Sequence, residues 1–494
     1  MCRCFTLNVD LTSFEQVPCF KIKMTEPIKA CLLSPKNRLD LLKKAKYNTF
    51  GLASQDVAID FLTDSGTGAM SQEQWSALLL GDESYAGASS YKKFEQMFQT
   101  LTGMQYILPA HQGRAAERTL FEGLASLDVL TKDSIIASNA FFDTTLGWAS
   151  QFSRCENVYC EDFDKGNEVD AAFKGNLSVA RLEKLTKENP GKVKLVLLTV
   201  TNNTGGGQPV SMANIREVSV FCKANKILFF LDACRFAENA FFIKTREKGY
   251  ENKTIKEIVR EMFSFVDGAT FSAKKDARVN IGGAILFSQA HENIYLACRP
   301  SVIRNEGLFT YGGMAGRDLE AIAQGLNETT EFPYLQNRVG QIQLLHSLLK
   351  KIGVPLVNPA GGSAVYIDAK KYLSNIPEGE YRSDTLALLL YAIGGIRSVA
   401  IGNLMYAEKT TEGKILTPAK NDFVRLAVPR NVYATEHIFY VVNVFEKLNA
   451  VKDKLTHGVA VDGTLRNDHF DHFDCKMHLI NEQNFEQTVL SKIS

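Results

Sequence analysis

The chain has 494 residues, 45% of them hydrophobic, which is enough for a large core and for two domains. Its 56 Lys and Arg residues nearly balance 55 Asp and Glu residues, and a formal net charge of +1 lacks the basic bias of proteins that bind nucleic acid or anionic membranes. The ten cysteines have no framework spacing, no apolar run approaches the ~18 residues of a membrane helix, and the first residues lack the apolar core of a signal peptide. We therefore expect a cytoplasmic protein with free thiols, and neither a membrane nor a nucleic acid as its partner.

Residues up to about 60 are of mixed texture and end in a short predicted strand, 56–62. The turn at 63–68 is rich in hydroxyls and glycine, and it either binds an anion or caps the helix predicted over 72–80. The polar stretch 81–87 is bounded by glycines, which suits a functional loop, although composition alone favours a plain surface connection.

A strand, a glycine-containing turn and a helix follow one another between 106 and 124, after an amphipathic helix at 90–102. This order offers backbone N–H groups and the positive end of a helix to a phosphate, and Arg114 adds a charged fork. An ordinary strand-to-helix turn has the same pattern, so this motif alone leaves both interpretations open.

From here predicted strands and helices alternate, which favours a parallel sheet with right-handed crossovers. Five side chains come just after predicted strands, and because such strand ends share one edge of a sheet, we expect them to lie close together. They are Gln112, Phe142, Asn203, Asp232 and Lys275.

Asp232 follows the apolar run 227–231, which predicts a strand buried on both faces. Lys274 and Lys275 lie between an apolar run around 263–271 and the glycine-flanked strand predicted at 281–287. A carboxylate for a pyridinium nitrogen and a lysine amine for an aldehyde are the layout of a pyridoxal phosphate (PLP) site. The alternatives are a helix N-cap for Asp232 and a solvated turn for the lysines.

After about residue 334 the alternation is lost. We predict a connecting helix over 335–352, strands at 364–368 and 423–429, a helix over 384–393 and a last helix with Thr435 as its N-cap, which together suggest a smaller α+β domain. The predicted division is an N-terminal arm and part of the small domain at 1–60, a large PLP-binding domain at 61–333 and the rest of the small domain at 334–494.

The tail holds His469, His472 and His478 among acidic residues that include Asp468 and Asp474. No fixed zinc spacing is met, so a solvated tail is favoured over a metal cluster.

Six runs together resemble one family, the PLP-dependent β-eliminating lyases, to which tryptophanases and tyrosine phenol-lyases belong. The runs are LTDSGT at 62–67, GDESYAG at 81–87, HQGR at 111–114, GGQPVS at 206–211, DACR at 232–235 and SAKKD at 272–276. The resemblance extends from about residue 15 to about residue 475, nearly the whole chain.

The resemblance implies an α/β fold of the PLP-dependent transferase type I, like aspartate aminotransferase, with a large mostly parallel sheet domain and a smaller α+β domain. It implies a homotetramer that uses PLP and a potassium ion, and an amino acid as small-molecule substrate. The implied reaction is β-elimination of L-tryptophan to indole, pyruvate and ammonia, by way of an aldimine with Lys275 and a quinonoid intermediate.

The resemblance also implies roles for individual residues. Lys275 would hold the cofactor and remove the Cα proton, and Tyr85 would act in protonation near the leaving group. The implied cofactor residues are Gln112, Gly113, Arg114, Ser272 and Lys274 at the phosphate, Phe142 stacked on the ring, Asp232 at the pyridine nitrogen, and Asn203 and Arg235 at the phenolic oxygen. Arg425 would bind the substrate carboxylate with Thr63 and Ser65 nearby, and Gly66, Glu83 and Asn280 match the potassium site.

Three positions favour tryptophan as the substrate. Ile401 stands where tyrosine phenol-lyases have an arginine for the phenol hydroxyl, and an apolar residue there suits indole. Asp143 and His472 resemble the tryptophanase pattern for moving a proton at the indole. The alternatives are a tyrosine phenol-lyase, a lyase for S-substituted cysteines, an aminotransferase or a non-catalytic homologue.

A few positions depart from the family. Ser89 replaces an arginine and Ser363 a histidine, while Asn280 is more like the phenol-lyase version. These departures bear on rate and substrate preference and leave the cofactor residues intact.

Overall fold

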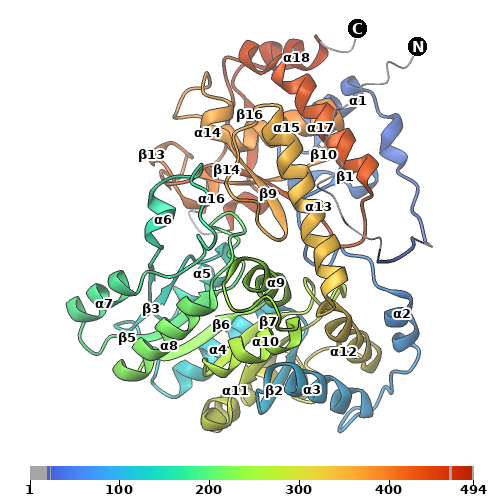
Figure 1. The fold of residues 1–494 in the computed structure, drawn as a ribbon. Coiled ribbons are helices and arrows are strands. Elements are labelled where there is room, and N and C mark those ends of the chain that lie inside the picture. The colour runs from blue at the N-terminus through green and yellow to red at the C-terminus, as the bar shows by residue number, and fades with distance from the viewer. Residues whose placement is uncertain (1–18, 23, 467–469, 492–494) are drawn as a thin grey trace.

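A seven-stranded sheet forms the centre of the lower half of the molecule in Figure 1. The computed structural model describes residues 19–22, 24–466 and 470–491. The strand order is β2-β8-β7-β6-β5-β3-β4, and the strands are β2 (Tyr106–Ala110), β3 (Ile135–Ser138), β4 (Arg154–Asn157), β5 (Val193–Thr199), β6 (Leu228–Asp232), β7 (Gly268–Ser272) and β8 (Gly283–Phe287). Only β8 runs antiparallel to its neighbours, so the predicted α/β class with a mostly parallel sheet is confirmed.

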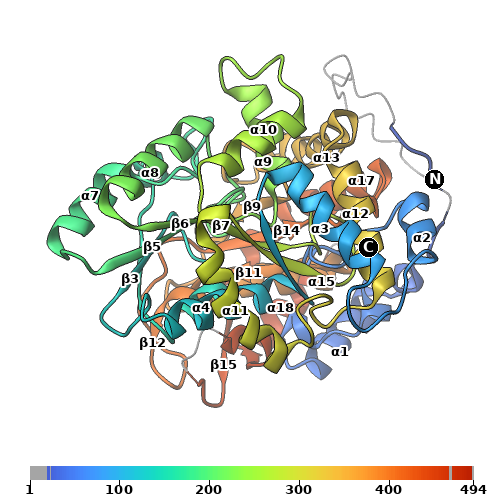
Figure 2. The ribbon, with the colours of Figure 1, turned by 90° about the horizontal axis from the view of Figure 1, so that it is seen from below.

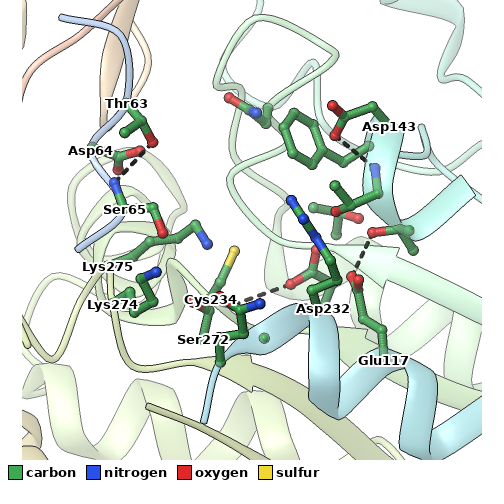
Figure 3. Close-up of a pocket in the computed structure, with 18 of the residues that line it drawn as sticks. Thr63, Asp64, Ser65, Glu117, Asp143, Asp232, Cys234, Ser272, Lys274 and Lys275 are labelled. Carbon is green, nitrogen blue, oxygen red and sulfur yellow. Dashed lines mark hydrogen bonds between the residues drawn. The ribbon is translucent and has the colours of Figure 1, made fainter. Parts of the chain in front are cut away.

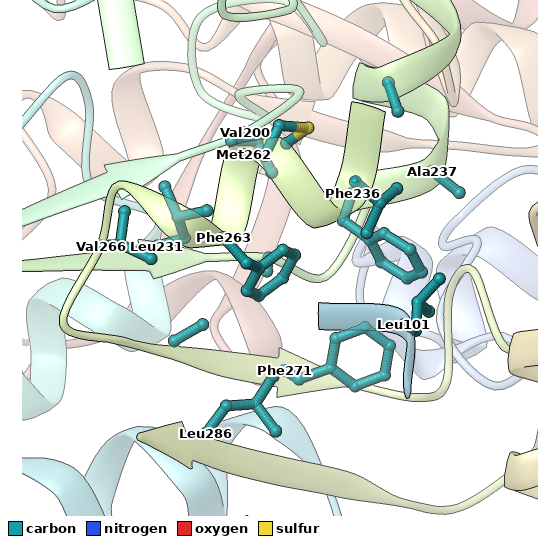
Figure 4. Packing of buried hydrophobic residues seen from close by; sticks show 14 of the residues in the cluster. Leu101, Val200, Leu231, Phe236, Ala237, Met262, Phe263, Val266, Phe271 and Leu286 are labelled. Atoms are coloured by element: carbon teal, nitrogen blue, oxygen red, sulfur yellow. The ribbon is translucent and has the colours of Figure 1, made fainter. Parts of the chain in front are cut away.

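A hydrophobic core covers each face of this sheet. Alternate side chains of each strand point to opposite faces, so each strand contributes to both cores. In β6, Phe229 and Leu231 join one core and Phe230 joins the other. The first core packs against α3 (Ser89–Thr102), α8 (Met212–Asn225), α9 (Phe236–Arg246) and α10 (Ile255–Ser264), and the second packs against α4 (Gly113–Ser126) and α11 (Glu292–Asn305). Figures 2 and 4 show this layering, and in Figure 4 Phe236 and Phe263 lie over Phe271 of β7.

A separate hydrophobic core lies in the upper half of Figure 1. Its elements are α1 (Pro35–Lys44), α15 (Arg382–Gly394), α17 (Thr435–Asn449) and α18 (Glu482–Leu490), with strands β1 (Ile59–Asp60), β9 (Ala364–Asp368), β10 (Ile396–Arg397), β14 (Phe423–Ala427), β15 (Val459–Asp462) and β16 (Lys476–Leu479). The strands β11 (Val399–Ile401), β14 and β9 form an antiparallel sheet in that order. The N-terminal segment and the C-terminal third thus share one core.

One long helix, α13 (Phe332–Lys351), joins the two halves. Its first half gives Tyr334, Leu335 and Val339 to the core of the large sheet. Its second half gives Ile342, Leu345, Leu348 and Leu349 to the other core. The domain boundaries at 60 and 333 stay a prediction.

Two details differ from the sequence-based expectations. The strand expected over 56–62 is only Ile59–Asp60, which pairs with β10, and Asp56 ends the 3₁₀ helix Ser54–Asp56 before it. Thr435 is the first residue of α17 and not its N-cap; Ala434 precedes the helix, and the side chain of His437 bonds its backbone N–H.

The remaining elements cover the surface and the junction. They are α2 (Gln72–Leu78), α5 (Asp143–Ala149), α6 (Glu161–Asp164), α7 (Val179–Glu188), α12 (Gly316–Thr329), α14 (Ala369–Tyr372), α16 (Asn403–Tyr406), β12 (Glu408–Lys409) and β13 (Ile415–Thr417). Among the residues that the structure describes, none of these helices has the length and apolar character to cross a membrane.

Candidate active site

A cavity of about 300 Å³ lies at the carboxyl edge of the large sheet and is closed by segments of the other half of the molecule (Figure 3). Most of the site residues expected from sequence line it. They are Thr63, Ser65, Gln112, Gly113, Arg114, Phe142, Asp143, Asn203, Asp232, Arg235, Ser272, Lys274, Lys275, Ile401, Arg425 and His472. The five residues expected to follow strands of one sheet are therefore neighbours in space.

The lysine pair lies in the connection between β7 and β8, which is short because β8 turns back antiparallel to β7. Figure 3 shows Lys275 and Asp232 on opposite sides of the cavity. Burial, helped by the positive charges of Lys275 and Arg114, lowers the pKa of Lys274. Three cationic side chains thus gather at one end of the cavity.

The same end holds the start of α4. Gln112 is its N-cap residue and Gly113 its first residue, so unpaired backbone N–H groups face the cationic cluster. A Cβ atom on Gly113 would lie 2.7 Å from Cβ of Ser272, so only glycine fits. A helix N-terminus beside three cations is an anion site of the kind that a phosphate group occupies.

Asp232 is the last residue of β6 and accepts a hydrogen bond from the backbone N–H of Cys234 at 3.4 Å. The helix-cap alternative is wrong, since α9 begins at Phe236 with Arg235 in the cap position. The carboxylate therefore faces the cavity at the edge of the sheet.

A second carboxyl group, which the sequence did not reveal, lies near Asp232. Glu117 of α4 is buried, and one of its oxygens accepts a hydrogen bond from Oγ1 of Thr145 at 2.5 Å. Its other oxygen has no partner. Burial, reinforced by the charge of Asp232, raises the pKa of Glu117 to about 8, so it is protonated at neutral pH.

Asn203 is held in one orientation by two donors. The hydroxyl of Tyr366 and Nη1 of Arg425 both donate to its Oδ1, at 2.6 Å and 2.9 Å. Its amide NH₂ is therefore left to donate into the cavity. Tyr366 lies on β9, far along the chain, and no motif marks it.

Arg425 lies on β14 and is buried. Its Nη2 donates to the carbonyl oxygen of Leu62 at 3.0 Å, while Nε has no partner. A buried guanidinium with an unused donor beside a cavity is suited to a carboxylate ligand.

Arg235 is fixed by Asp64. Its Nε and Nη2 donate to the two oxygens of that carboxylate at 3.1 Å and 2.6 Å. Asp64 also accepts from Arg430 at 3.0 Å. Burial would raise the pKa of Asp64, but the charges of Arg235 and Arg430 outweigh it and hold this pKa well below its ordinary value.

These charges belong to a larger buried network. Arg430 also pairs with Glu238 at 2.6 Å and Asp276 at 2.9 Å, and Glu238 pairs with Arg338 of α13. Asp276 directly follows Lys275. The network therefore ties the lysine loop to both halves of the molecule.

Asp143 and His472 form a buried pair, with Oδ2 and Nε2 3.1 Å apart. Asp143 opens α5, while His472 lies in the 3₁₀ helix Asp471–Phe473 near the C-terminus. The rings of Phe50 and Phe473 pack against the imidazole, and both line the cavity. His469, which could align with the His-Phe pattern of tryptophanases in place of His472, lies, like Asp468, outside the described residues.

The remaining predicted residues do not line the cavity. Tyr85 is 73% exposed and its ring lies 5.5 Å from that of Tyr311. Asn280 donates to the carbonyl oxygen of Gly66 at 3.0 Å. Glu83 instead accepts from the backbone N–H of Gly316 at the start of α12.

The potassium site therefore stays a prediction, since in one chain Glu83 contacts α12 whereas Gly66 and Asn280 contact each other. Within 19–22, 24–466 and 470–491, no group of three His, Cys, Asp or Glu side chains is suited to hold a metal ion. His478 lies exposed on β16, away from the cavity.

The comparisons with known proteins identify the family of the chain. The family described as "Beta-eliminating lyase" matches residues 60–443. A "Probable beta-eliminating lyase" of Trichomonas vaginalis is 45% identical over 90% of this chain and 94% of its own. The tryptophanase of Salinibacter ruber is 48% identical over 88% and 90%, and the tyrosine phenol-lyase of Pasteurella multocida is 40% identical over 88% and 93%.

Solved structures show the same fold at low identity. A threonine aldolase of Leishmania major has a TM-score of 0.55 at 14% identity, covering 79% of this chain and 99% of its own. A serine palmitoyltransferase of S. paucimobilis with a PLP adduct has a TM-score of 0.54 at 13% identity, covering 80% and 88%. The fold type expected from sequence is confirmed by these neighbours.

Proposed function

Because this chain belongs to the β-eliminating lyase family and is a carbon–carbon lyase, we propose that it cleaves L-tryptophan to indole, pyruvate and ammonia. The observation that carries this choice of substrate is the buried Asp143–His472 pair beside the apolar side chain of Ile401. The pair supplies a proton donor and the wall around it supplies no partner for a phenol hydroxyl.

The residues present fit the PLP of this family. The N-terminus of α4 with Arg114, Lys274 and Ser272 would hold the phosphate, and Asp232 would face the pyridine nitrogen. The free NH₂ of Asn203 would reach the phenolic oxygen. When bound, PLP supplies an electron sink for the negative charge that develops at the substrate Cα.

The substrate would be oriented by its carboxylate. The unused Nε of Arg425 marks the place, and Thr63 and Ser65 line the cavity beside it. This clamp directs the Cα–H bond toward the amine of Lys275, which is the base in our proposal.

The aryl end of the cavity is apolar, with Phe50, Val399, Ile401, Met405 and Phe473 in its wall. Indole needs no hydrogen bond there, whereas a buried phenol hydroxyl would lack a partner. The aryl carbon must gain a proton before it can leave, and in our proposal Asp143, paired with His472, is the acid that supplies it.

We also infer a cytoplasmic homotetramer that uses potassium. Large apolar side chains are exposed on the N-terminal segment and just after α2, for example Leu32 at 89% and Leu79 at 88%, as expected of a surface that a second copy covers. Tyr85 is exposed and Glu83 lies apart from Gly66 and Asn280, so in our proposal residues of a second copy complete the surroundings of Tyr85 and of the potassium ion.

The test is product analysis of the protein loaded with PLP in potassium buffer, with L-tryptophan and L-tyrosine as substrates. We expect pyruvate and indole in equal amounts from tryptophan and little phenol from tyrosine. Phenol as the main product would refute the proposal that Ile401 selects indole over phenol. If Ile401 has no such role, Ile401→Arg should change the ratio of the tryptophan and tyrosine rates little.

A further inference from the structure

His472 separates the substrate cavity from a second, much smaller cavity. Three side chains, those of His472, Phe50 and Val399, line both. On the substrate side Nε2 of His472 meets Asp143 at 3.1 Å. On the other side its Nδ1 has no hydrogen-bond partner, although the residue is only 5% exposed.

An unpaired buried ring nitrogen is costly unless water reaches it. The second cavity measures about 20 Å³, enough for one water molecule, which needs roughly 10–15 Å³. Its other polar lining is Tyr47, Asn48, Thr49 and Asp384. Asn48 is already engaged, since its Nδ2 donates to the carbonyl oxygens of His472 and Cys475 and its Oδ1 accepts from Phe50.

Asp384 is the remaining acid on this cavity. It lies in the first turn of α15, next to Ser383, whose hydroxyl donates to Oδ1 of Asp422 at 2.6 Å. Burial and the nearby negative charge of Asp422 raise the pKa of Asp384 to about 7. The other titratable groups near it are Tyr381, Cys475 and Asp471, and on the cavity wall Tyr47 and His472; no Lys or Arg lines this cavity among the described residues.

We propose that Asp384 is the proton reservoir of the site, and that it delivers its proton to Asp143 through a water molecule in the small cavity and the imidazole of His472. This inference rests on the proposed function, because only an aryl leaving group must be protonated at carbon. It assigns a role to an acid that no motif in the sequence marks.

The transfer is a balanced shift of one proton. His472 gives the proton on Nε2 to Oδ2 of Asp143, and its Nδ1 takes a proton from the water. The water takes a proton from the carboxyl group of Asp384, which becomes a carboxylate. No electron is transferred. When the product leaves, a solvent proton reaches Nε2 of His472, and the proton on Nδ1 returns through the water to Asp384, so that one proton from solvent restores both groups.

The test compares two substrates on the PLP-loaded enzyme. L-Tryptophan needs protonation of its aryl carbon, whereas S-methyl-L-cysteine releases a thiolate that leaves without it. Asp384→Asn should lower kcat for tryptophan about tenfold, which is less than the loss of a general acid usually causes, because Asp143 itself remains. It should change kcat for S-methyl-L-cysteine less than about twofold. Asp384→Glu, which keeps an acid, should restore much of the tryptophan rate.

The control is Asp453→Asn, which removes an exposed carboxylate with 77% of its side chain accessible. It should leave both rates unchanged. Equal losses on both substrates for Asp384→Asn would mean a structural role and would overturn the relay, as would no loss on either.

A second readout needs neither cofactor nor turnover. In the infrared spectrum of the protein without PLP, the difference between wild type and Asp384→Asn should show the carbonyl band of one protonated carboxyl group that titrates near pH 7. The bands of Asp276 and Glu117, whose pKa values are also raised, are common to both proteins and cancel in this difference. His472→Gln should displace that midpoint, because it removes the partner across the water. An unchanged midpoint would overturn the relay, and it would do so even if tryptophan proves not to be the substrate.

Discussion

The two ends of the active-site cavity are built in different ways. The cofactor end comes from segments that follow neighbouring strands of one sheet, such as Gln112 after β2, Asp232 at the end of β6 and Lys275 after β7. The aryl end is assembled from distant parts of the chain, with Phe50 from the N-terminal segment, Ile401 from β11 and His472 from the tail. The residues of the cofactor end are therefore positioned by one sheet. The residues of the aryl end, which selects the substrate, come from separate segments that can vary independently.

The largest effect is expected at the cofactor end. Lys275→Ala should abolish elimination from every substrate, a loss of at least about a thousandfold, because it removes both the covalent attachment and the base. Pyruvate release and the visible absorbance of the PLP-loaded protein check this together. Turnover on any substrate at near wild-type rate would refute the role of Lys275.

The next effect should be confined to the aryl end. His472→Gln should lower kcat for L-tryptophan by about a hundredfold, since Asp143 loses its partner, and should spare S-methyl-L-cysteine. Steady-state kinetics on both substrates check it. If both rates fall together, His472 supports the cavity as a whole and the contrast between the two ends is lost.

A third substitution tests how the cofactor end is held. Asp64→Asn leaves Arg235 and Arg430 without their shared carboxylate in a buried place, which should lower the free energy of unfolding by about 3 kcal/mol. Urea unfolding measures the change. Asp162→Asn, which breaks an exposed pair with Lys165, is the matched control and should cost less than about 1 kcal/mol.

The last prediction concerns the dependence of stability on pH. The pKa of Glu117 is raised to about 8 in the fold, whereas in the unfolded chain it is near 4.5, so the fold binds the proton more tightly and loses stability as the pH rises between these values. Glu117→Gln removes this dependence. Its melting temperature relative to the wild type should therefore climb from about pH 5 to pH 8 and then level off, as calorimetry at several pH values can check. A constant difference would mean that Glu117 is not protonated in the fold.

Much of the cofactor end could be predicted from the sequence because its residues lie in short runs, and short runs carry local signals. The end of an apolar strand placed Asp232, and the strand-turn-helix order placed Gln112 and Arg114. The loop that carries Lys275 needed only the two apolar runs around it. In each case the chain itself brings neighbours together.

The rest depended on contacts between distant segments, which leave no local signal. Glu117 is one helical turn after Gly113 and reads as an ordinary helix residue until Asp232 is seen beside it. Tyr366 fixes Asn203 from another sheet across 163 positions. The pattern at 56–62 predicts a short strand but not its partner, which is β10, 337 positions away.

The helix α13 has a consequence for how far the chain can be divided. Its 20 residues complete two cores at once, so neither half keeps a closed hydrophobic interior when the other is removed. The cavity obeys the same constraint, because its walls come from both halves. A chimaera that takes one half from a relative would therefore also need the residues of α13 that pack into that half. Whether such a chimaera folds should depend on how well α13 packs against both cores.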